Sequence, residues 1–369
     1  MLLIKNLFPC ISMQNCNMIK ETYNNGSVLP TDGRDCGNPR PYNRLEPVRV
    51  SVVVPVYGVE RFVERCVRGL MEQTLREGVE FIFVDDATPD GSMEIVRKTI
   101  ADYPDRASQV KILTHESNRG LPTARNTGMD AARGEWVCHI DSDDFPECDM
   151  LESQLAEAER SGADMVWCDW YLTGENSERP MPQPSISDAR EATVAMLGGA
   201  MKYNVWNKLT RRSIFTDNNI RFPDGHAMGE DMTMIMAATC CQKTAHVARP
   251  LYHYRRTNTA AMTQAYSERH LVDLRFNVER TADFVLSHDP AMAAEMDFFK
   301  LQVKFPFLLM RPRRRGWQLW REWWPEANRR IGENHHMSGH SRVAQRCAAI
   351  GLRPLVALYA MALEMIQKR

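Results

Sequence analysis

The 369-residue chain contains no run of about 18 apolar residues, and this absence argues against a membrane-spanning helix. Its ten cysteines include no CxxC pair, which argues against a zinc knuckle or a thioredoxin-type redox motif, so we expect reduced thiols. No G-x-G-x-x-G follows the first predicted strand, which disfavours a dinucleotide-binding dehydrogenase. What is present is an apolar fraction of 44%, enough for a large core.

The chain also lacks an overall excess of charge of one sign, since its formal net charge is -1. This average hides a basic C-terminal segment, because residues 301–369 contain thirteen Lys and Arg against four Glu and no Asp. No nucleic-acid-binding motif accompanies the segment, so we expect no nucleic-acid partner.

Predicted strands and helices alternate over the first half of the chain. Continuous β-branched and aromatic runs favour buried strands, and apolar residues at helical spacing favour the helices between them. The predicted strands are 48–56, 80–84, 110–114, 135–140 and 164–168, and the predicted helices are 61–73, 93–103, 122–132 and 150–160. This alternation predicts an α/β fold with a mostly parallel sheet and helices on both faces.

Beyond residue 173 the pattern is less regular. We expect a polar, proline-rich boundary loop at 174–184, a helix at 232–241, a strand at 246–254 and a helical region after residue 264. At the other end, residues 1–47 are expected to form a disordered extension, because much of the segment is rich in Asn, Gly, Pro and Asp. A true translation start at Met18 is an alternative explanation for part of this extension.

Two acidic turns follow predicted strands. Asp85 and Asp86 come after the strand at 80–84, and three further aspartates, Asp141, Asp143 and Asp144, come after the strand at 135–140. Carboxylates this close together repel one another unless a cation neutralises them, most often a divalent metal with oxygen ligands. Because open α/β sheets bind ligands at the carboxyl ends of their strands, the sequence predicts a metal and ligand site there.

Five motifs in a fixed order carry a wider resemblance. They are Ser51–Tyr57 (SVVVPVY), Val84–Asp86 (VDD), Asn118–Gly128 (NRGLPTARNTG), Asp141–Asp144 (DSDD) and Gly229–Asp231 (GED). In this order they resemble the family 2 glycosyltransferases, which have the Rossmann-like GT-A fold. The resemblance implies a GT-A domain at 48–262, with a nucleotide-binding half at 48–173 and an acceptor half at 185–262, followed by a C-terminal helical region at 263–369.

The resemblance also implies an activity. This is the inverting transfer of a hexosyl or N-acetylhexosaminyl group from a nucleotide-diphosphate sugar, expected to be UDP-linked, to a lipid-linked, oligosaccharide or polysaccharide acceptor in bacterial surface-glycan synthesis. Pro55, Tyr57 and Asp86 are expected to line the nucleotide pocket, with Tyr57 stacked on the base. Arg125 is expected to pair either with a phosphate or with one of the acidic turns.

The family's Asp-x-Asp motif corresponds to Asp141 and Asp143. These residues are expected to hold Mn2+ or Mg2+ against the diphosphate, with Asp141 also contributing to donor binding. Asp144 is expected to bind sugar hydroxyls of the donor or, alternatively, to cap the next helix. His253 is expected as a further metal ligand, with a core or surface histidine as the alternative. Arg255 or its neighbour Arg256 is expected to close over the diphosphate.

The family's catalytic base corresponds to Asp231, with Glu230 beside it. Capping of the following helix is an alternative or additional role for Asp231. Trp206 and Lys208 lie in a stretch that resembles the border of the acceptor cleft, where Trp206 would offer a flat face to a sugar ring. Burial in the core is the alternative for this tryptophan.

The basic segment has an amphipathic pattern. Arg313–Arg315 adjoin Trp317, Trp320 and Trp324 on one helical face, and a second apolar stripe follows at Leu352, Leu355, Val356, Tyr359, Leu363 and Ile366. We expect peripheral membrane contact through residues 311–369, and hence a cytoplasmic protein at the inner face of the cell membrane. The alternative is that both helices pack on the catalytic domain with their arginines solvated.

Other classes of function are weaker interpretations. A non-catalytic nucleotide-sugar-binding protein would keep the fold, but it would have no need of Asp141, Asp143 and Asp231 together. A glycosidase would need two carboxylates but no nucleotide pocket.

Overall fold

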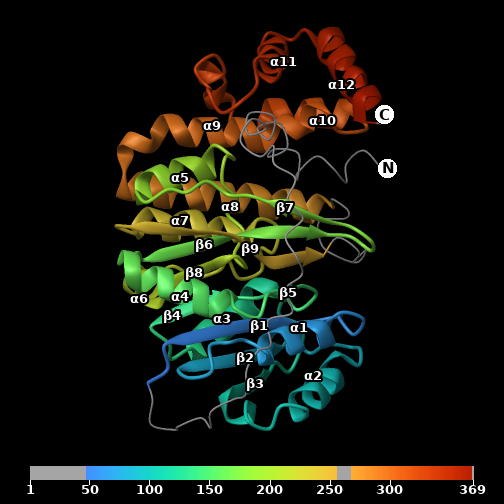
Figure 1. Ribbon diagram of the computed structural model, residues 1–369. Coiled ribbons are helices and arrows are strands. Elements are labelled where there is room, and N and C mark those ends of the chain that lie inside the picture. The colour runs from blue at the N-terminus through green and yellow to red at the C-terminus, as the bar shows by residue number, and fades with distance from the viewer. Residues whose placement is uncertain (1–46, 256–266, 368–369) are drawn as a thin grey trace.

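A computed structural model describes residues 47–255 and 267–367 (Figure 1). The predictions made for residues 1–46, for Arg256 and for the end of the acceptor half therefore lie outside the described residues. None of the helices in the described part is long and apolar enough to cross a membrane.

The first half of the chain forms the parallel part of the sheet. The strands β3 (Val110–Thr114), β2 (Val79–Asp85), β1 (Val50–Val56) and β4 (Trp136–His139) lie side by side in that order, and all of their pairings are parallel. Every residue of β1 is buried, because it is covered on both faces and paired on both edges. The predicted parallel sheet and the predicted strand positions are confirmed in this region.

The sheet continues without a break into the second half of the chain. β8 (Lys208–Arg211) runs antiparallel between β4 and β6 (Met165–Thr173), and β9 (Thr244–Arg255) pairs in parallel with β6. The short β5 (Phe145–Pro146) pairs with β9 at the far edge. The two predicted halves, 48–173 and 185–262, therefore share one sheet and interleave within it.

Residues 174–184 form the predicted loop only in part, and they do not mark a boundary in the sheet. Instead β7 (Glu178–Met181) pairs antiparallel with β6, so the segment is the end of a hairpin. The polar composition that suggested a loop fits this arrangement, because the residues of β7 are exposed or half-buried.

Helices cover the sheet and its edges. α1 (Val63–Met71) packs on α2 (Ser92–Ala101), α3 (Leu121–Ala131) packs on β1 and β2, and α4 (Met150–Ser161) packs on β6 and β9. Gly128 lets α3 approach β1 closely, since a Cβ at this position would lie 2.2 Å from a methyl carbon of Val53. The last glycine of the NRGLPTARNTG motif is thus explained by packing.

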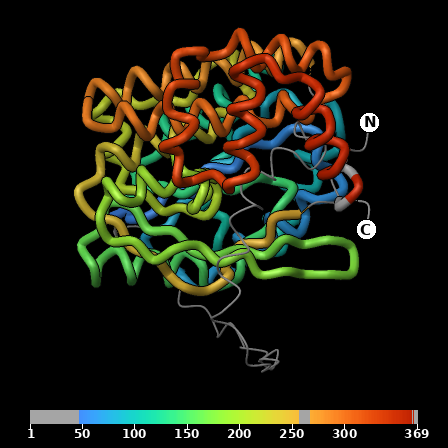
Figure 2. The backbone as a smooth tube through the Cα atoms, turned by 90° about the horizontal axis from the view of Figure 1, so that it is seen from above, coloured from blue at the N-terminus to red at the C-terminus, as the bar shows by residue number. Residues whose placement is uncertain are grey.

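Later helices form layers beyond the sheet. α5 (Ala189–Leu197) packs on α7 (Thr233–Cys240). Beyond them, α9 (Ala293–Lys304) packs on α5, and α8 (Glu268–His288) packs on α7. The short α6 (Arg212–Asp217) follows β8. Figure 1 shows α8 and α9 far from the β3 edge, and Figures 1 and 2 place α11 (Gly339–Ala349) and α12 (Arg353–Gln367) together on the outside of this layer. The predicted C-terminal helical region is confirmed.

The tryptophans of the basic segment do not face solvent. Trp320 on α10 (Arg313–Glu322) is 1% exposed and Trp324 is 5% exposed, while Trp317 is partly buried against the same core. The Lys304 ammonium lies 4.6 Å from the Trp320 ring centre, within the protein interior. The predicted tryptophan face for membrane anchoring is therefore wrong, because these side chains hold α10 on the body of the protein.

Candidate active site

The carboxyl ends of three parallel strands bring the predicted nucleotide-binding residues to one edge of the sheet. Tyr57 directly follows β1, Asp86 directly follows β2, and Asp141 is the second residue after β4. Pro55 is buried within β1, whereas the Tyr57 side chain is half exposed beyond the strand end. An exposed aromatic ring at this edge is available for stacking on a base.

Asp86 is held almost entirely by protein groups. Its carboxylate accepts hydrogen bonds of 2.8 Å from the backbone amides of Arg119 and Gly120, and it lies 2.7 Å from Nδ1 of His115. The residue is 3% exposed. These contacts fasten the loop that begins the NRGLPTARNTG motif to the end of β2, so Asp86 has a structural role at this edge of the sheet.

The second acidic turn gathers three carboxylates. Oxygen atoms of Asp141, Asp143 and Asp144 lie within 4.8 Å of one another. Asp144 is buried, and its two oxygens accept hydrogen bonds from the Tyr252 hydroxyl at 2.9 Å and the Arg255 amide at 2.7 Å. Burial, and then the charges of Asp143 and Asp141, raise the pKa of Asp144. Such mutual repulsion is relieved when a cation binds.

The three aspartates of this turn differ in exposure, and this difference separates their roles. Asp144 already serves the fold through β9, whereas Asp141 and Asp143 are half-buried at the surface of the turn. Arg125 occupies one oxygen of Asp141 at 2.8 Å, which leaves Oδ2 of the same carboxylate for another partner. The donor set of this turn thus fits a hard divalent ion that takes oxygen ligands.

Arg125 connects this turn to the predicted base. The guanidinium is 1% exposed, and its Nη2 lies 2.8 Å from Asp141 and 3.8 Å from Oε1 of Glu230. Its Nε and Nη1 atoms are buried without a hydrogen-bond partner among the described residues. Arg125 therefore links Asp141 in the acidic turn with Glu230, about ninety residues later in the sequence.

Glu230 and Asp231 lie in a short 3-10 turn, Glu230–Met232, directly before α7. Gly229 precedes the turn with a φ of 91°, a conformation that favours glycine. Burial raises the pKa of both carboxyls, with the Asp231 charge adding to the effect on Glu230 and Arg125 opposing it at each. Asp231 Oδ1 is buried without a hydrogen-bond partner among the described residues. An oxygen of this kind is suited to accept a proton from a bound hydroxyl.

Trp206 and Lys208 do not face an open cleft. Trp206 is 4% exposed and stacks on Tyr252, with ring centres 4.3 Å apart, so its face is not free for a sugar ring. The Lys208 ammonium is buried and donates three hydrogen bonds, to the carbonyls of Lys202 and Asn204 and to the Asn207 side chain. The acceptor contacts predicted for these two residues are wrong, because Tyr252 covers the Trp206 ring and the Lys208 ammonium is bonded to the 202–207 segment.

His253 is not available as a metal ligand. Its Nε2 lies 2.7 Å from Glu147 and its Nδ1 lies 2.9 Å from Glu178, so carboxylates engage both ring nitrogens. The ring stacks on Phe145, 4.2 Å between centres, where β5 pairs with β9. The predicted ligand role of His253 is therefore wrong. Arg255 donates its backbone amide to Asp144 in the acidic turn, and its guanidinium lies over the Phe62 and Phe145 rings.

Sequence reasoning missed several residues that build the site. Tyr252 bridges the acidic turn by donating to Asp144 while it accepts from the Asp141 amide. The Asn126 side chain bonds both the amide and the carbonyl of Phe222, and so attaches the 222–224 segment to α3. The only available signal was the position of Asn126 inside a recognised motif, since no spacing pattern links it to Phe222.

The chain is similar to known proteins in sequence and in fold. A sequence model described as glycosyl transferase family 2 matches residues 51–233. The chain belongs to the family 2 glycosyltransferases. The uncharacterized glycosyltransferase EpsJ of Bacillus subtilis is 34% identical over 197 residues, which are 51% of this family member and 55% of EpsJ. The poly(ribitol-phosphate) beta-glucosyltransferase of Bacillus spizizenii is 27% identical over 56% of the chain and 32% of that protein.

The alignments thus span about half or less of the length of these two relatives. A solved structure supports the fold over a longer stretch. The crystal structure of S. aureus TarS 1–349 in complex with UDP-GlcNAc matches with a TM-score of 0.64 at 20% identity, covering 87% of this family member and 92% of the TarS chain. The predicted GT-A architecture with an added C-terminal helical region is confirmed.

Proposed function

We propose that this family member transfers one sugar from a nucleotide-diphosphate sugar to an acceptor hydroxyl, with inversion at the anomeric carbon. The donor is expected to be a UDP-sugar, in line with the UDP-GlcNAc complex of TarS. The acceptor is expected to be lipid-linked or a polysaccharide, and the relative named for poly(ribitol-phosphate) supports the polymeric option. Near-identical motifs serve different sugars, so the sugar itself is left to experiment.

The observation that carries the proposal is the Arg125 bridge. A transferase of this type must bring a diphosphate-binding group and a base to one bond, on opposite sides of the reacting carbon. Arg125 holds Asp141 on one side and lies 3.8 Å from Glu230, next to Asp231, on the other. If Asp141 lay only in a solvated acidic turn and Asp231 were only a helix cap, no buried arginine would be needed between the two.

On the donor side, Tyr57 is proposed to stack on the base, and Asp141 and Asp143 are proposed to hold Mn2+ or Mg2+. The ion would supply positive charge to neutralise the departing diphosphate. Arg125 orients Asp141 from behind through its 2.8 Å contact. The turn is kept in shape by Asp144, which Tyr252 and the Arg255 amide hold in place.

On the acceptor side, Asp231 is proposed to accept the proton of the attacking hydroxyl. Its raised pKa makes it a stronger base than an exposed aspartate, and its unpartnered Oδ1 gives that hydroxyl a place to donate. Lys208 supports it indirectly, since the buried ammonium fixes the segment that includes Val205, whose backbone amide bonds to Asp231.

The proposal is tested by a thermal-shift panel of nucleotide sugars, each measured with Mn2+ and with EDTA. A ligand that binds only the native state raises the melting temperature by mass action. We expect UDP-sugars with Mn2+ to raise Tm and simple glycosides to leave it unchanged. A panel in which no nucleotide sugar changes Tm would contradict the proposed function.

We also propose peripheral contact with the inner face of the cell membrane, through α12 rather than through the tryptophans. Val356 faces the core, but four apolar side chains on other sides of the helix are exposed: Leu355, Leu358, Met361 and Met365. Leu352, which is also exposed, directly precedes the helix. Exposed Arg353 and Arg346 lie at the start of α12 and the end of α11. Exposed apolar side chains flanked by arginines match an interfacial helix, and each basic residue near an anionic bilayer contributes about 1 kcal/mol.

The double substitution Leu355→Glu with Leu358→Glu tests this contact. We expect it to remove most co-sedimentation with vesicles that contain anionic lipid, measured at low salt, because it places two negative charges on the face of the helix that would enter the bilayer. Val272→Glu on α8 is the matched control, since Val272 is another exposed apolar residue, 61% exposed and outside α12. Equal vesicle binding by the double variant and the control would show that α12 does not contact the bilayer.

A further inference from the structure

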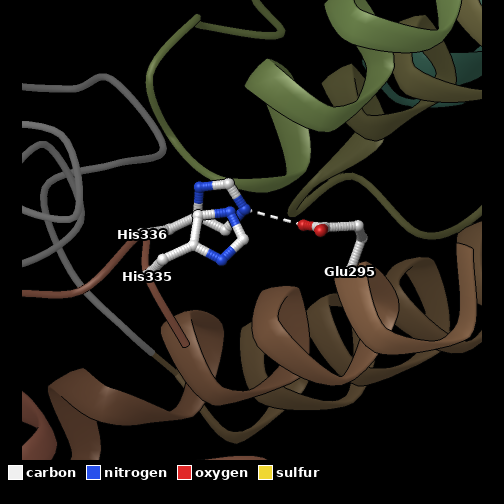
Figure 3. Close-up of side chains that lie close together, drawn as sticks. All are labelled: Glu295, His335 and His336. Carbon is white, nitrogen blue, oxygen red and sulfur yellow. Dashed lines mark hydrogen bonds and ion pairs between the residues drawn. The ribbon is translucent and has the colours of Figure 1, made fainter. Parts of the chain in front are cut away.

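A second group of ligand-type side chains lies far from the acidic turn, in the C-terminal helical region. Glu295 in the first turn of α9 faces His335 and His336 in the segment before α11 (Figure 3). One ligand atom from each residue lies within 4.8 Å of the other two, and Glu295 Oε2 is 2.7 Å from Nε2 of His336. The two imidazole rings lie against each other, with centres 4.0 Å apart.

The surroundings of this cluster fix the His336 ring. A Cβ on Gly198, at the end of α5, would lie 2.3 Å from Nδ1 of His336, so the ring packs directly on a backbone that carries no side chain. Buried Asn334 holds the segment by accepting from the His336 amide at 3.1 Å. Phe298, one turn after Glu295, contacts both imidazoles edge-on and forms an apolar floor. The cluster therefore comes from two parts of the chain and packs on a third, the end of α5.

We propose that Glu295, His335 and His336 bind a divalent transition-metal ion of the zinc class, which fastens the segment before α11 to α9. This inference goes beyond the proposed function, because it concerns neither the donor nor the acceptor. Two imidazoles and one carboxylate are a ligand set that zinc favours, with water completing the tetrahedron. Mg2+ and Ca2+ prefer oxygen ligands, so the histidines separate this site chemically from the acidic turn.

The geometry needs only a small adjustment to take the ion. Zinc bonds of ~2.0–2.1 Å place neighbouring ligand atoms about 3.3 Å apart in a tetrahedron. The Glu295–His336 contact would open slightly from 2.7 Å, and His335, which is exposed, would turn its ring toward the pair.

The consequence of binding would be structural. The segment 331–338 joins the turn Pro325–Arg330 to α11, and α11 packs on α12. In this segment, His336 contacts Glu295 on α9 and packs on Gly198 at the end of α5. The Asn334 side chain donates to the carbonyl of Phe298, also on α9. A metal bridge to Glu295 would add a metal-dependent link beside the contact between Glu295 and His336, in addition to the core contacts that α11 and α12 already make.

The test uses the full-length, untagged protein freed of metal, in an Asp143→Ala background that weakens the other metal site. Zinc is titrated by calorimetry, Co2+ is followed by its visible absorption, and Tm is measured with and without zinc. We expect saturable zinc binding and a rise in Tm of several degrees at zinc about a hundredfold above Kd. Adding His335→Ala or Glu295→Gln is expected to weaken zinc binding by at least tenfold and to remove the rise in Tm.

His288→Ala is the matched control, because His288 is an exposed histidine on α8 outside the cluster. His335 is itself exposed, so its substitution is expected to leave the fold intact and the comparison informative. Zinc affinity and a rise in Tm that are the same in His335→Ala and His288→Ala would overturn the proposal, as would the absence of any zinc-dependent rise. In either case Glu295 and His336 form an ion pair only, and the proposed sugar transfer is unaffected.

Discussion

Asp231→Asn is expected to lower the rate of sugar transfer by about a hundredfold or more while donor affinity stays close to that of the unmodified protein. The substitution keeps the shape of the side chain but removes the oxygen that accepts the proton, and loss of a general base typically costs ~10²–10⁴-fold. Tm is expected to change little, because Oδ1 of Asp231 makes no hydrogen bond to the described residues. Steady-state kinetics with a fixed donor and acceptor measure the effect, and Asp130→Asn, an exposed carboxylate on α3, is the control.

The same residue predicts a pH dependence. Burial raises the pKa of Asp231, so the base becomes protonated at a higher pH than an exposed aspartate, whose pKa is about 3.9. Activity is therefore expected to be lost as pH falls through the mildly acidic range and to be regained as pH rises. Near-native turnover in Asp231→Asn, with the same acid limb in its pH profile, would move the role of base to Glu230.

Asp143→Ala is expected to abolish the metal-dependent part of donor binding. Asp143 is half-buried in a turn where three carboxylates lie within 4.8 Å of one another, and removing one of them leaves too few oxygen ligands for a divalent ion. Calorimetric titration of UDP in Mn2+ and in EDTA is expected to show a large difference for the unmodified protein and none for the variant. Unchanged UDP affinity under both conditions in both proteins would remove the metal from the mechanism.

Asp144→Ala separates the two roles within this turn. Asp144 accepts hydrogen bonds from Tyr252 and from the Arg255 amide, and the substitution leaves both donors unsatisfied. Its main effect is therefore expected on stability, of the order of 1–3 kcal/mol, as a lowered Tm even without metal. A loss of metal-dependent binding with no loss of stability would instead identify Asp144 as a ligand.

Local patterns in the sequence were sufficient for the sheet and for the acidic turns. The runs at Val50–Val56 and Val79–Asp85 are buried along almost their whole length, and such strands are recognised from composition alone. Their carboxyl ends must meet at one edge of a parallel sheet, so Tyr57, Asp86 and Asp141 were placed together correctly. Arg125 was predicted to pair either with a phosphate or with an acidic turn, and in the structure it pairs with Asp141 of the acidic turn.

The errors concern side chains whose roles depend on distant partners. Trp206 stacks on Tyr252, and His253 lies between Glu147 and Glu178, so neither role is encoded by neighbouring residues. The spacing of tryptophans beside arginines is the same for a helix at a bilayer and for a helix packed on a protein core. In this protein Trp320 is buried in the core. The hairpin strand β7 escaped notice because its polar residues pair at the exposed end of β6.

The central claim, metal-assisted sugar transfer at the site joined by Arg125, is tested most directly by release of free UDP. UDP-sugars are incubated with Mn2+ and with lipid or polysaccharide extracts as acceptor, and UDP is measured over time for the unmodified protein, Asp143→Ala and Asp231→Asn. The account predicts acceptor-stimulated UDP release from at least one UDP-sugar, lost in EDTA and in both variants. Release that persists equally in all three proteins, or that is insensitive to EDTA, would contradict it.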